Sequence, residues 1–361
     1  MKPKQLILGL VFLAALVSLA VYAQHQHPFD FHAFADQFRQ AGWQHIAIGV
    51  ACIYFAYVLR AIRWAFLIRH VKKVPPLSLL GTQVIGFTAV ALIGRVADFI
   101  RPYLVSRKTG LPISSQIATY IVERLFDAGA MALIFSSVIV FDAPQGSLPH
   151  QATVFKTSII ILALTIFGAL FLIELRLAGG RVDRLLKYPL RYASKGLAHS
   201  VEAKIHSFRL GLSVLRTPAD AAVTLALSLT MWALITLAYL ETAWAFAPTS
   251  PLLGSMSLAQ CVILLGASGG ASIFQLPVLG WFTQIGAVAA TLVGLGAQQE
   301  PATACAATLL IVTFLSVAPV GLIWAQFENI SLRSMAQESE HAAEAASDKI
   351  DQIESAEDAS A

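Results

Sequence analysis

Three charged residues occur within one of the most apolar segments of this sequence. Glu123, Arg124 and Asp127 lie about ten to fourteen residues into segment 114–141, which at 1.5 Å per residue is roughly 15–20 Å from its start. Glu123 and Asp127 are four residues apart, so they share one face of a helix. An ionised group inside a bilayer costs at least about 2.5 kcal/mol and is usually functional. We therefore expect a buried polar cluster.

A second group of charges precedes the first along the chain. Asp98 and Arg101, with Arg95 beside them, directly follow the short apolar stretch 79–94. If this stretch turns back within the membrane, its charges lie at a depth where Glu123 and its neighbours can meet them. The two groups then form one cluster.

Two interpretations of this cluster remain open. Guanidinium groups bind phosphate oxygens in pairs, so Arg101 and Arg124 would hold a lipid phosphate while the carboxylates orient them. Alternatively, acids and arginines only neutralise one another and fix neighbouring segments in place. The two interpretations are compatible, because a site needs a scaffold. Four further basic residues are expected to extend towards the membrane surface as positive-inside residues: Arg60, Arg63, Arg107 and Lys108.

The composition predicts the kind of structural element that carries these charges. The chain is 57% hydrophobic and only 13% charged, whereas water-soluble domains carry roughly a quarter charged residues. The sequence therefore predicts membrane-spanning helices. The strongly apolar segments are 6–23, 44–68, 114–141, 157–175, 220–247 and 303–326. The first also resembles a signal peptide ending at Val21-Tyr22-Ala23, although its length favours an uncleaved span.

The distribution of lysine and arginine predicts the orientation of these spans. Loop 176–219 carries nine basic residues, whereas loops 24–43 and 142–156 carry only Arg39 and Lys156. We expect the basic loop and both termini to lie in the cytoplasm of a bacterial cell, with the chain in the inner membrane. The segment between spans 44–68 and 114–141 must then enter and leave on the cytoplasmic side.

Two apolar stretches do not fit a simple crossing. Stretch 79–94 is too short, and stretch 257–296 is interrupted by Pro277 and Gly280, residue types that break helices. Irregular backbone at membrane depth is tolerated only where protein or a water-filled cavity satisfies its polar groups. The sequence therefore predicts two re-entrant or broken hairpins.

These features predict an all-α polytopic integral membrane protein with about six full spans and two broken hairpins. The order of span, hairpin and span occurs twice with opposite orientation, an inverted repeat of the kind found in many transporters, with the binding site at the repeat interface. The expected parts are a transmembrane domain at 1–326, repeats at 44–141 and 220–326, the basic loop 176–219 and an acidic, disordered cytoplasmic tail at 327–361.

The sequence contains no nucleotide-binding loop, zinc motif or nucleophile elbow. Loop 176–219 has 44 residues, too few for an ordinary catalytic domain. We therefore expect no catalytic residue, no cofactor, no metal and no enzymatic activity.

The sequence resembles the lysylphosphatidylglycerol synthase transmembrane-region family, also called flippase-like. The matching residues are Gly94-Arg95-Val96-Ala97-Asp98-Phe99-Ile100-Arg101-Pro102-Tyr103-Leu104, Arg107, Gly110, Ile121-Val122-Glu123-Arg124-Leu125-Phe126-Asp127 and Leu59-Arg60-Ala61-Ile62-Arg63-Trp64. The chain departs from the family pattern at Ala97 and Val278-Leu279, which replace glycines, and at Gln284, where glutamate is common. The resemblance implies translocation of a lipid or lipid-linked substrate between leaflets, in a stand-alone member that lacks the aminoacyl-transferase domain.

Three hypotheses follow from the residues and the resemblance together. The first is a lipid flippase-like transporter whose partner is an anionic phospholipid or glycolipid. The second is a non-transporting scaffold for a lipid or polysaccharide synthesis protein, and the third is an integral membrane enzyme that uses Glu123 or Asp127 as a base. No nucleic-acid partner is expected. The predicted substrate-binding residues are Arg95, Asp98, Arg101, Glu123, Arg124, Asp127, Pro277, Gly280 and Gln284.

Overall fold

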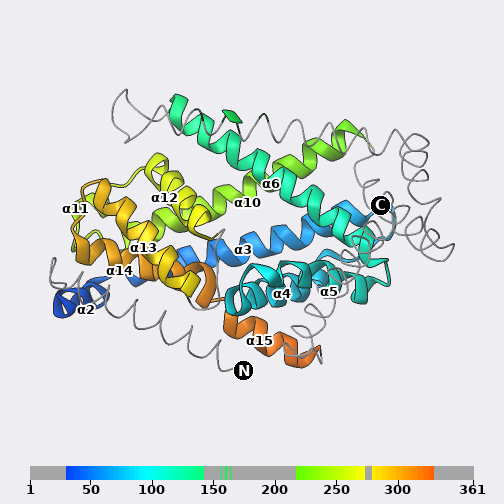
Figure 1. The fold of residues 1–361 in the computed structure, drawn as a ribbon, viewed down its shortest axis with the longest axis horizontal. Helices are drawn as coiled ribbons and strands as arrows, with labels where there is room; N and C mark the ends of the chain where they lie inside the picture. Colours follow the sequence, from blue (N-terminus) through cyan, green and yellow to red (C-terminus); the bar gives the residue numbers. More distant parts are fainter. Residues whose placement is uncertain are drawn as a thin grey trace, which may run out of the picture.

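The computed structural model describes residues 30–141, 217–272 and 279–328, together with four single positions between 156 and 163. Every regular element within these ranges is helical (Figure 1), which confirms the predicted all-α membrane class. The predicted segments 6–23, 157–175, 176–219 and 327–361 lie wholly or almost wholly outside the described residues.

Long apolar helices form the frame of the molecule. Within the described residues, four helices are long and apolar enough to cross a membrane: Trp43–Ile68, Pro76–Ile93, Pro218–Trp244 and Gln299–Phe327. The first is α3 and the third is α10. Helix α6, Ile113–Phe141, has 29 residues, which gives it a length of roughly 43 Å. It carries Glu123, Arg124 and Asp127. The chain is therefore a multi-pass membrane protein.

The first predicted hairpin consists of α4, Leu80–Ile93, and α5, Ile100–Thr109, which contact each other. Helix α4 ends at Gly94, whose φ of 95° and ψ of −169° only glycine adopts without strain. A 3₁₀ turn, Arg95–Phe99, then reverses the chain. Although Pro76–Ile93 reaches 18 residues when the preceding turn is counted, α4 itself is only about 21 Å long, shorter than the ~30 Å hydrocarbon core.

The second hairpin pairs α12, Leu258–Ala271, with α13, Leu279–Gly294. Helix α12 begins at Ser257, whose hydroxyl accepts from the Gln260 amide while the Gln260 side chain accepts from the Ser257 amide, a capping box that fixes the start of the helix. Residues 273–278, which join the two helices in sequence, lie outside the described residues.

Short polar contacts connect the helices at both ends of the molecule. At one end, the Gly42 amide donates to the Ala245 carbonyl over 2.7 Å, and we call this the Gly42 end. At the other, Arg69 Nη2 lies 2.5 Å from Asp220 Oδ1, and Lys108 lies 2.5 Å from Glu328. We call this the Arg69 end. Helices α3 and α10 pack side by side and run in opposite directions between the two ends (Figure 1).

The two hairpins approach each other between these ends. Trp281, near the start of α13, donates its indole N–H to the Ala91 carbonyl near the end of α4 over 2.9 Å. Helix α4 packs against α15, Ala318–Phe327, while α12 packs against α6. Each hairpin therefore contacts the last long helical segment of the other half of the chain.

Candidate functional site

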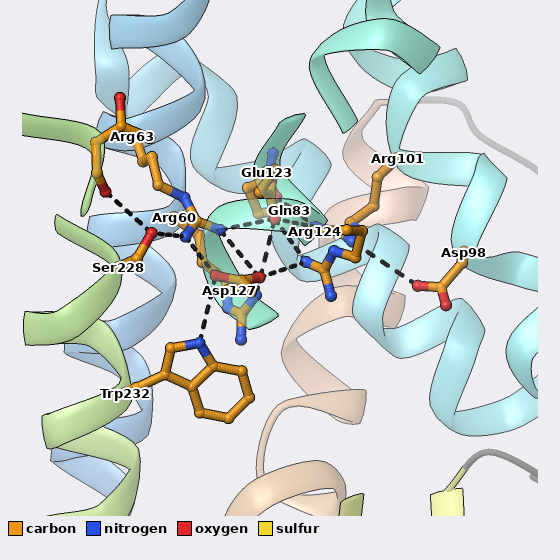
Figure 2. Close-up of polar contacts among 11 residues, drawn as sticks. Arg60, Arg63, Gln83, Asp98, Arg101, Glu123, Arg124, Asp127, Ser228 and Trp232 are labelled. Atoms are coloured by element: carbon orange, nitrogen blue, oxygen red, sulfur yellow. Dashed lines mark hydrogen bonds and ion pairs between the residues drawn. The ribbon is translucent and has the colours of Figure 1, made fainter. Parts of the chain in front are cut away.

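Glu123 lies at the centre of a buried ionic cluster (Figure 2). Its fully buried Oε1 is 2.9 Å from Arg63 Nη2, 3.1 Å from Arg101 Nη1 and 2.6 Å from Arg124 Nη2. Three guanidinium groups from α3, α5 and α6 thus converge on one carboxylate oxygen. This convergence joins the first hairpin to the long helices, as expected if the charges neutralise one another and fix neighbouring segments in place.

Asp127, one helical turn after Glu123, connects the cluster to α10. Its carboxylate binds Arg63 through both oxygens, over 2.5 and 3.3 Å, and lies 3.1 Å from Arg124 Nη2. The Trp232 indole donates to Asp127 over 3.3 Å, and Arg63 also donates to Ser228 over 2.6 Å. Arg63 is therefore bonded to groups on α6 and α10 while its side chain is only 1% exposed.

Arg101 is enclosed by protein. Its guanidinium lies 4.4 Å from the ring centre of Phe87 and 5.1 Å from that of Tyr120, distances typical of cation–π contacts. Its side chain has no exposed area. It packs over Gly86, where an added Cβ would lie 2.1 Å from Arg101 Cγ. Arg101 thus fixes α5 against its neighbours.

Arg60 differs from the other arginines of the cluster. Its Nη1 lies 4.0 Å from Glu123 Oε1, beyond hydrogen-bond distance, and has no hydrogen-bond partner among the described residues. Its guanidinium lies 4.5 Å from the ring centre of Phe87. Arg60 is 7% exposed, so it is a buried cation whose charge is only weakly compensated.

The arrangement has an excess of positive charge. Among the described side chains, four guanidinium groups, those of Arg60, Arg63, Arg101 and Arg124, face the carboxylates of Asp98, Glu123 and Asp127. One positive charge remains uncompensated in a region of low dielectric constant, where it attracts an anion strongly. The cluster is therefore suited to bind an anion rather than a metal ion.

A cavity of about 940 Å³ adjoins this cluster. Arg60, Asp98, Arg124 and Asp127 form its charged end, and apolar and aromatic side chains from α3, α4, α6, α10 and α12 form most of the remaining wall. Arg124 makes both of its ion pairs through Nη2 and keeps 32% of its side chain exposed. Arg101 does not line the cavity. A cavity with a cationic end and apolar walls can hold an amphipathic anion.

Arg60 and Arg63 correct one sequence-based expectation. They do not extend to the membrane surface, because both are buried and Arg63 is paired with Glu123 and Asp127. Arg107 and Lys108, by contrast, are exposed at the end of α5, and their place at the membrane surface stays a prediction. The Arg-x-x-Arg-Trp pattern at 60–64 places both arginines on one helix face, but it does not show whether that face contacts protein or the membrane surface. Trp232 and Ser228 gave no sequence signal, because neither is charged.

Only some of the other predicted site residues line the cavity. Asp98 and Gln284 line the cavity, while Gly280 is buried at the start of α13 and does not line it. The side chain of Arg95, and the whole of Pro277, lie outside the described residues. Glu241 of α10, an acidic residue that does not line the cavity, bonds His45 of α3 over 2.7 Å.

Comparison with known proteins gives a family match. The model of the lysylphosphatidylglycerol synthase TM region matches residues 6–321, nearly the whole chain. No curated protein and no solved structure matches the sequence. The matched range contains both hairpins and every residue of the ionic cluster, so the chain belongs to the family of the lysylphosphatidylglycerol synthase transmembrane region.

Proposed function

We propose that this protein moves an anionic lipid between the two leaflets of the membrane. The observation that carries the proposal is the excess positive charge at one end of the apolar-walled cavity, next to Arg60 and Arg124. A phosphate group cannot enter hydrocarbon without a compensating charge, and guanidinium groups bind phosphate oxygens strongly. The sequence predicted that Arg101 and Arg124 bind the lipid phosphate. Since Arg101 is enclosed by protein, we assign phosphate binding to Arg60 and Arg124 instead.

The packing of the hairpins supports an inverted repeat. Equivalent helices α3 and α10 lie antiparallel, and each hairpin packs on the last long segment of the other half. Each hairpin reaches towards the interior from a different end, and the cavity lies between the two. Transporters built in this way change access by moving one repeat against the other around a fixed site.

The positive-inside rule supports the orientation. Arg69, Lys72, Lys73, Arg107 and Lys108 gather at the Arg69 end, which we place in the cytoplasm of a bacterial cell. The Gly42 end then faces the outside, and the protein lies in the inner membrane. In this orientation the charged end of the cavity, with Arg60 in the half of α3 nearer Arg69, lies in the cytoplasmic half of the bilayer.

Arg60→Gln tests the proposal. The purified protein is placed in vesicles containing an anionic phospholipid with a fluorescent acyl chain, and a membrane-impermeant reductant reports movement between leaflets. We expect exchange to slow at least about tenfold, because a charge-assisted hydrogen bond is worth ~1.5–3 kcal/mol and each ~1.4 kcal/mol is a factor of ten in rate.

The matched control is Arg39→Gln, which removes an arginine that is 82% exposed and should leave the rate unchanged. Equal rates for the two variants would contradict a role for Arg60. If the folded wild-type protein moved no lipid at all, the scaffold hypothesis would be preferred.

A further inference from the structure

Three uncharged polar side chains gather on the cavity wall away from the arginines. Tyr239 of α10 donates to the Ser268 hydroxyl of α12 over 2.9 Å, and the Gln284 amide of α13 donates to the same oxygen over 2.5 Å. All three residues line the cavity. We call this group the neutral pole.

The hydrogen bonds within the neutral pole are incomplete. Gln284 is only 5% exposed, yet its Oε1 has no hydrogen-bond partner among the described residues. Ser268 Oγ accepts two hydrogen bonds, so its own proton is available for donation to a third group. Buried polar atoms are nearly always paired in native proteins. The pole therefore offers one acceptor and one donor, which together match a hydroxyl group.

Helix α10 gives the separation between the neutral pole and the charged end. Trp232 contacts Asp127, and Tyr239 follows seven residues later. Seven residues are two helical turns, so both side chains lie on one face, about 10 Å apart along the axis. Ile235 lies between them on the cavity wall. The separation fits a phosphate joined to a ring-sized polar group.

The pole is unsuited to a cationic group. Asp98 and Asp127, the carboxylates among the described cavity-lining residues, both belong to the charged end. An ammonium group at the neutral pole would be buried without a counter-charge, which is strongly unfavourable. The group recognised there must be uncharged and carry hydroxyls.

We infer that the neutral pole selects lipids whose phosphate bears an uncharged, hydroxyl-rich group, such as a polyol or sugar. The phosphate binds at Arg60 and Arg124, and one hydroxyl of the attached group bonds Gln284 Oε1 and Ser268 Oγ. This inference rests on the proposed translocation and adds the class of headgroup.

The test compares two lipids with identical fluorescent chains in the vesicle assay. Phosphatidylinositol carries a hydroxyl-rich ring, and phosphatidic acid carries only the phosphate. We expect the wild-type protein to move phosphatidylinositol about tenfold faster, because a hydroxyl of its ring can make two hydrogen bonds at the neutral pole that phosphatidic acid cannot make. In Gln284→Leu, which leaves only the Ser268 hydroxyl to bond the headgroup, this ratio should fall to about threefold or less.

Thr308→Val is the matched control, because Thr308 is buried, bonds only within its own helix and does not line the cavity. It should keep the wild-type ratio. If Gln284→Leu does not fold, Gln284→Glu provides the test, because its side chain has the same shape. The new carboxylate should raise the exchange of amine-bearing phosphatidylethanolamine relative to phosphatidylinositol at least about fivefold.

The outcomes separate the two proposals. A folded wild-type protein that moves neither lipid overturns the proposed function and this inference with it. A wild-type protein that moves both lipids at equal rates overturns only the neutral pole, as does a Gln284 variant that keeps the wild-type preference.

Discussion

Replacing Arg63 by methionine should destabilise the protein by about 3–5 kcal/mol. Arg63 is bonded to Glu123, Asp127 and Ser228 while its side chain is 1% exposed. Its removal takes from Glu123 and Asp127 the guanidinium that bonds both of them, and breaking a buried ion pair from one side typically has a cost of this size. The cluster would lose the group that connects α3 to both α6 and α10.

Thermal unfolding with a thiol-reactive fluorescent probe measures this loss. Cys52, Cys261 and Cys305 are all free and buried, so they react only when the fold opens. Arg39→Met is the control, because Arg39 forms an exposed pair with Asp36 and such pairs contribute little. If the two variants unfolded at the same temperature, Arg63 would not stabilise the fold as predicted.

Replacing Gly269 by leucine should reduce lipid exchange to the rate of protein-free vesicles. Gly269 lines the cavity, and a Cβ added there meets no described atom within 4 Å. The leucine side chain therefore projects into open space and occupies room that a lipid needs. Since leucine also favours helix more than glycine does, unfolding stability should not fall.

Gly286→Leu is the matched control for this blockade. Gly286 lies in α13, and a Cβ added there is equally unobstructed, but Gly286 does not line the cavity. Its exchange rate should equal that of the wild type. Normal exchange by a folded Gly269→Leu protein would show that lipid does not pass through this cavity.

Local sequence properties were sufficient to predict most of the helices. Segments 44–68 and 114–141 correspond to α3 and α6, and the predicted ends differ from the observed ones by at most one residue. Both helices could be located because a long apolar run and its basic flanks can be read from the local sequence. The pairing of α4 with α5 was also predictable, since stretch 79–94 is short and Gly94 permits the chain to reverse; that the pair does not cross the membrane stays a prediction.

The site was predictable only in part. Charges deep in a span identify Glu123, Arg124 and Asp127, because a buried charge is expensive wherever it lies in sequence. Arg60 and Arg63 were misinterpreted, since a basic residue near a helix end fits equally well at the membrane surface and in a buried pair. Only the packing of α3 against α6 and α10 shows that Arg60 and Arg63 are buried and not at the membrane surface.

Apart from Gln284, the uncharged contributors Ser268 and Gly269 could not be identified before the helices were placed. Gly269 acts by leaving space, and Ser268 acts through contacts with α10 and α13 that are far away in sequence. Neither has a local signature, because its effect depends on which residues face it. Tertiary packing decides the shape of the cavity and the position of its neutral pole.

Photo-crosslinking from within the cavity tests most directly whether an anionic lipid occupies it. Phe314 lines the cavity, whereas Phe282 is 69% exposed on α13 and does not line it. Each is replaced by benzoylphenylalanine, a photoreactive analogue, and the lipids attached after irradiation in native membranes are identified by mass spectrometry. We predict that adducts at position 314 are enriched in anionic lipids and lose this enrichment in Arg60→Gln, while adducts at position 282 match the bulk membrane. Adducts of bulk composition at both positions, or none at position 314, would contradict the account.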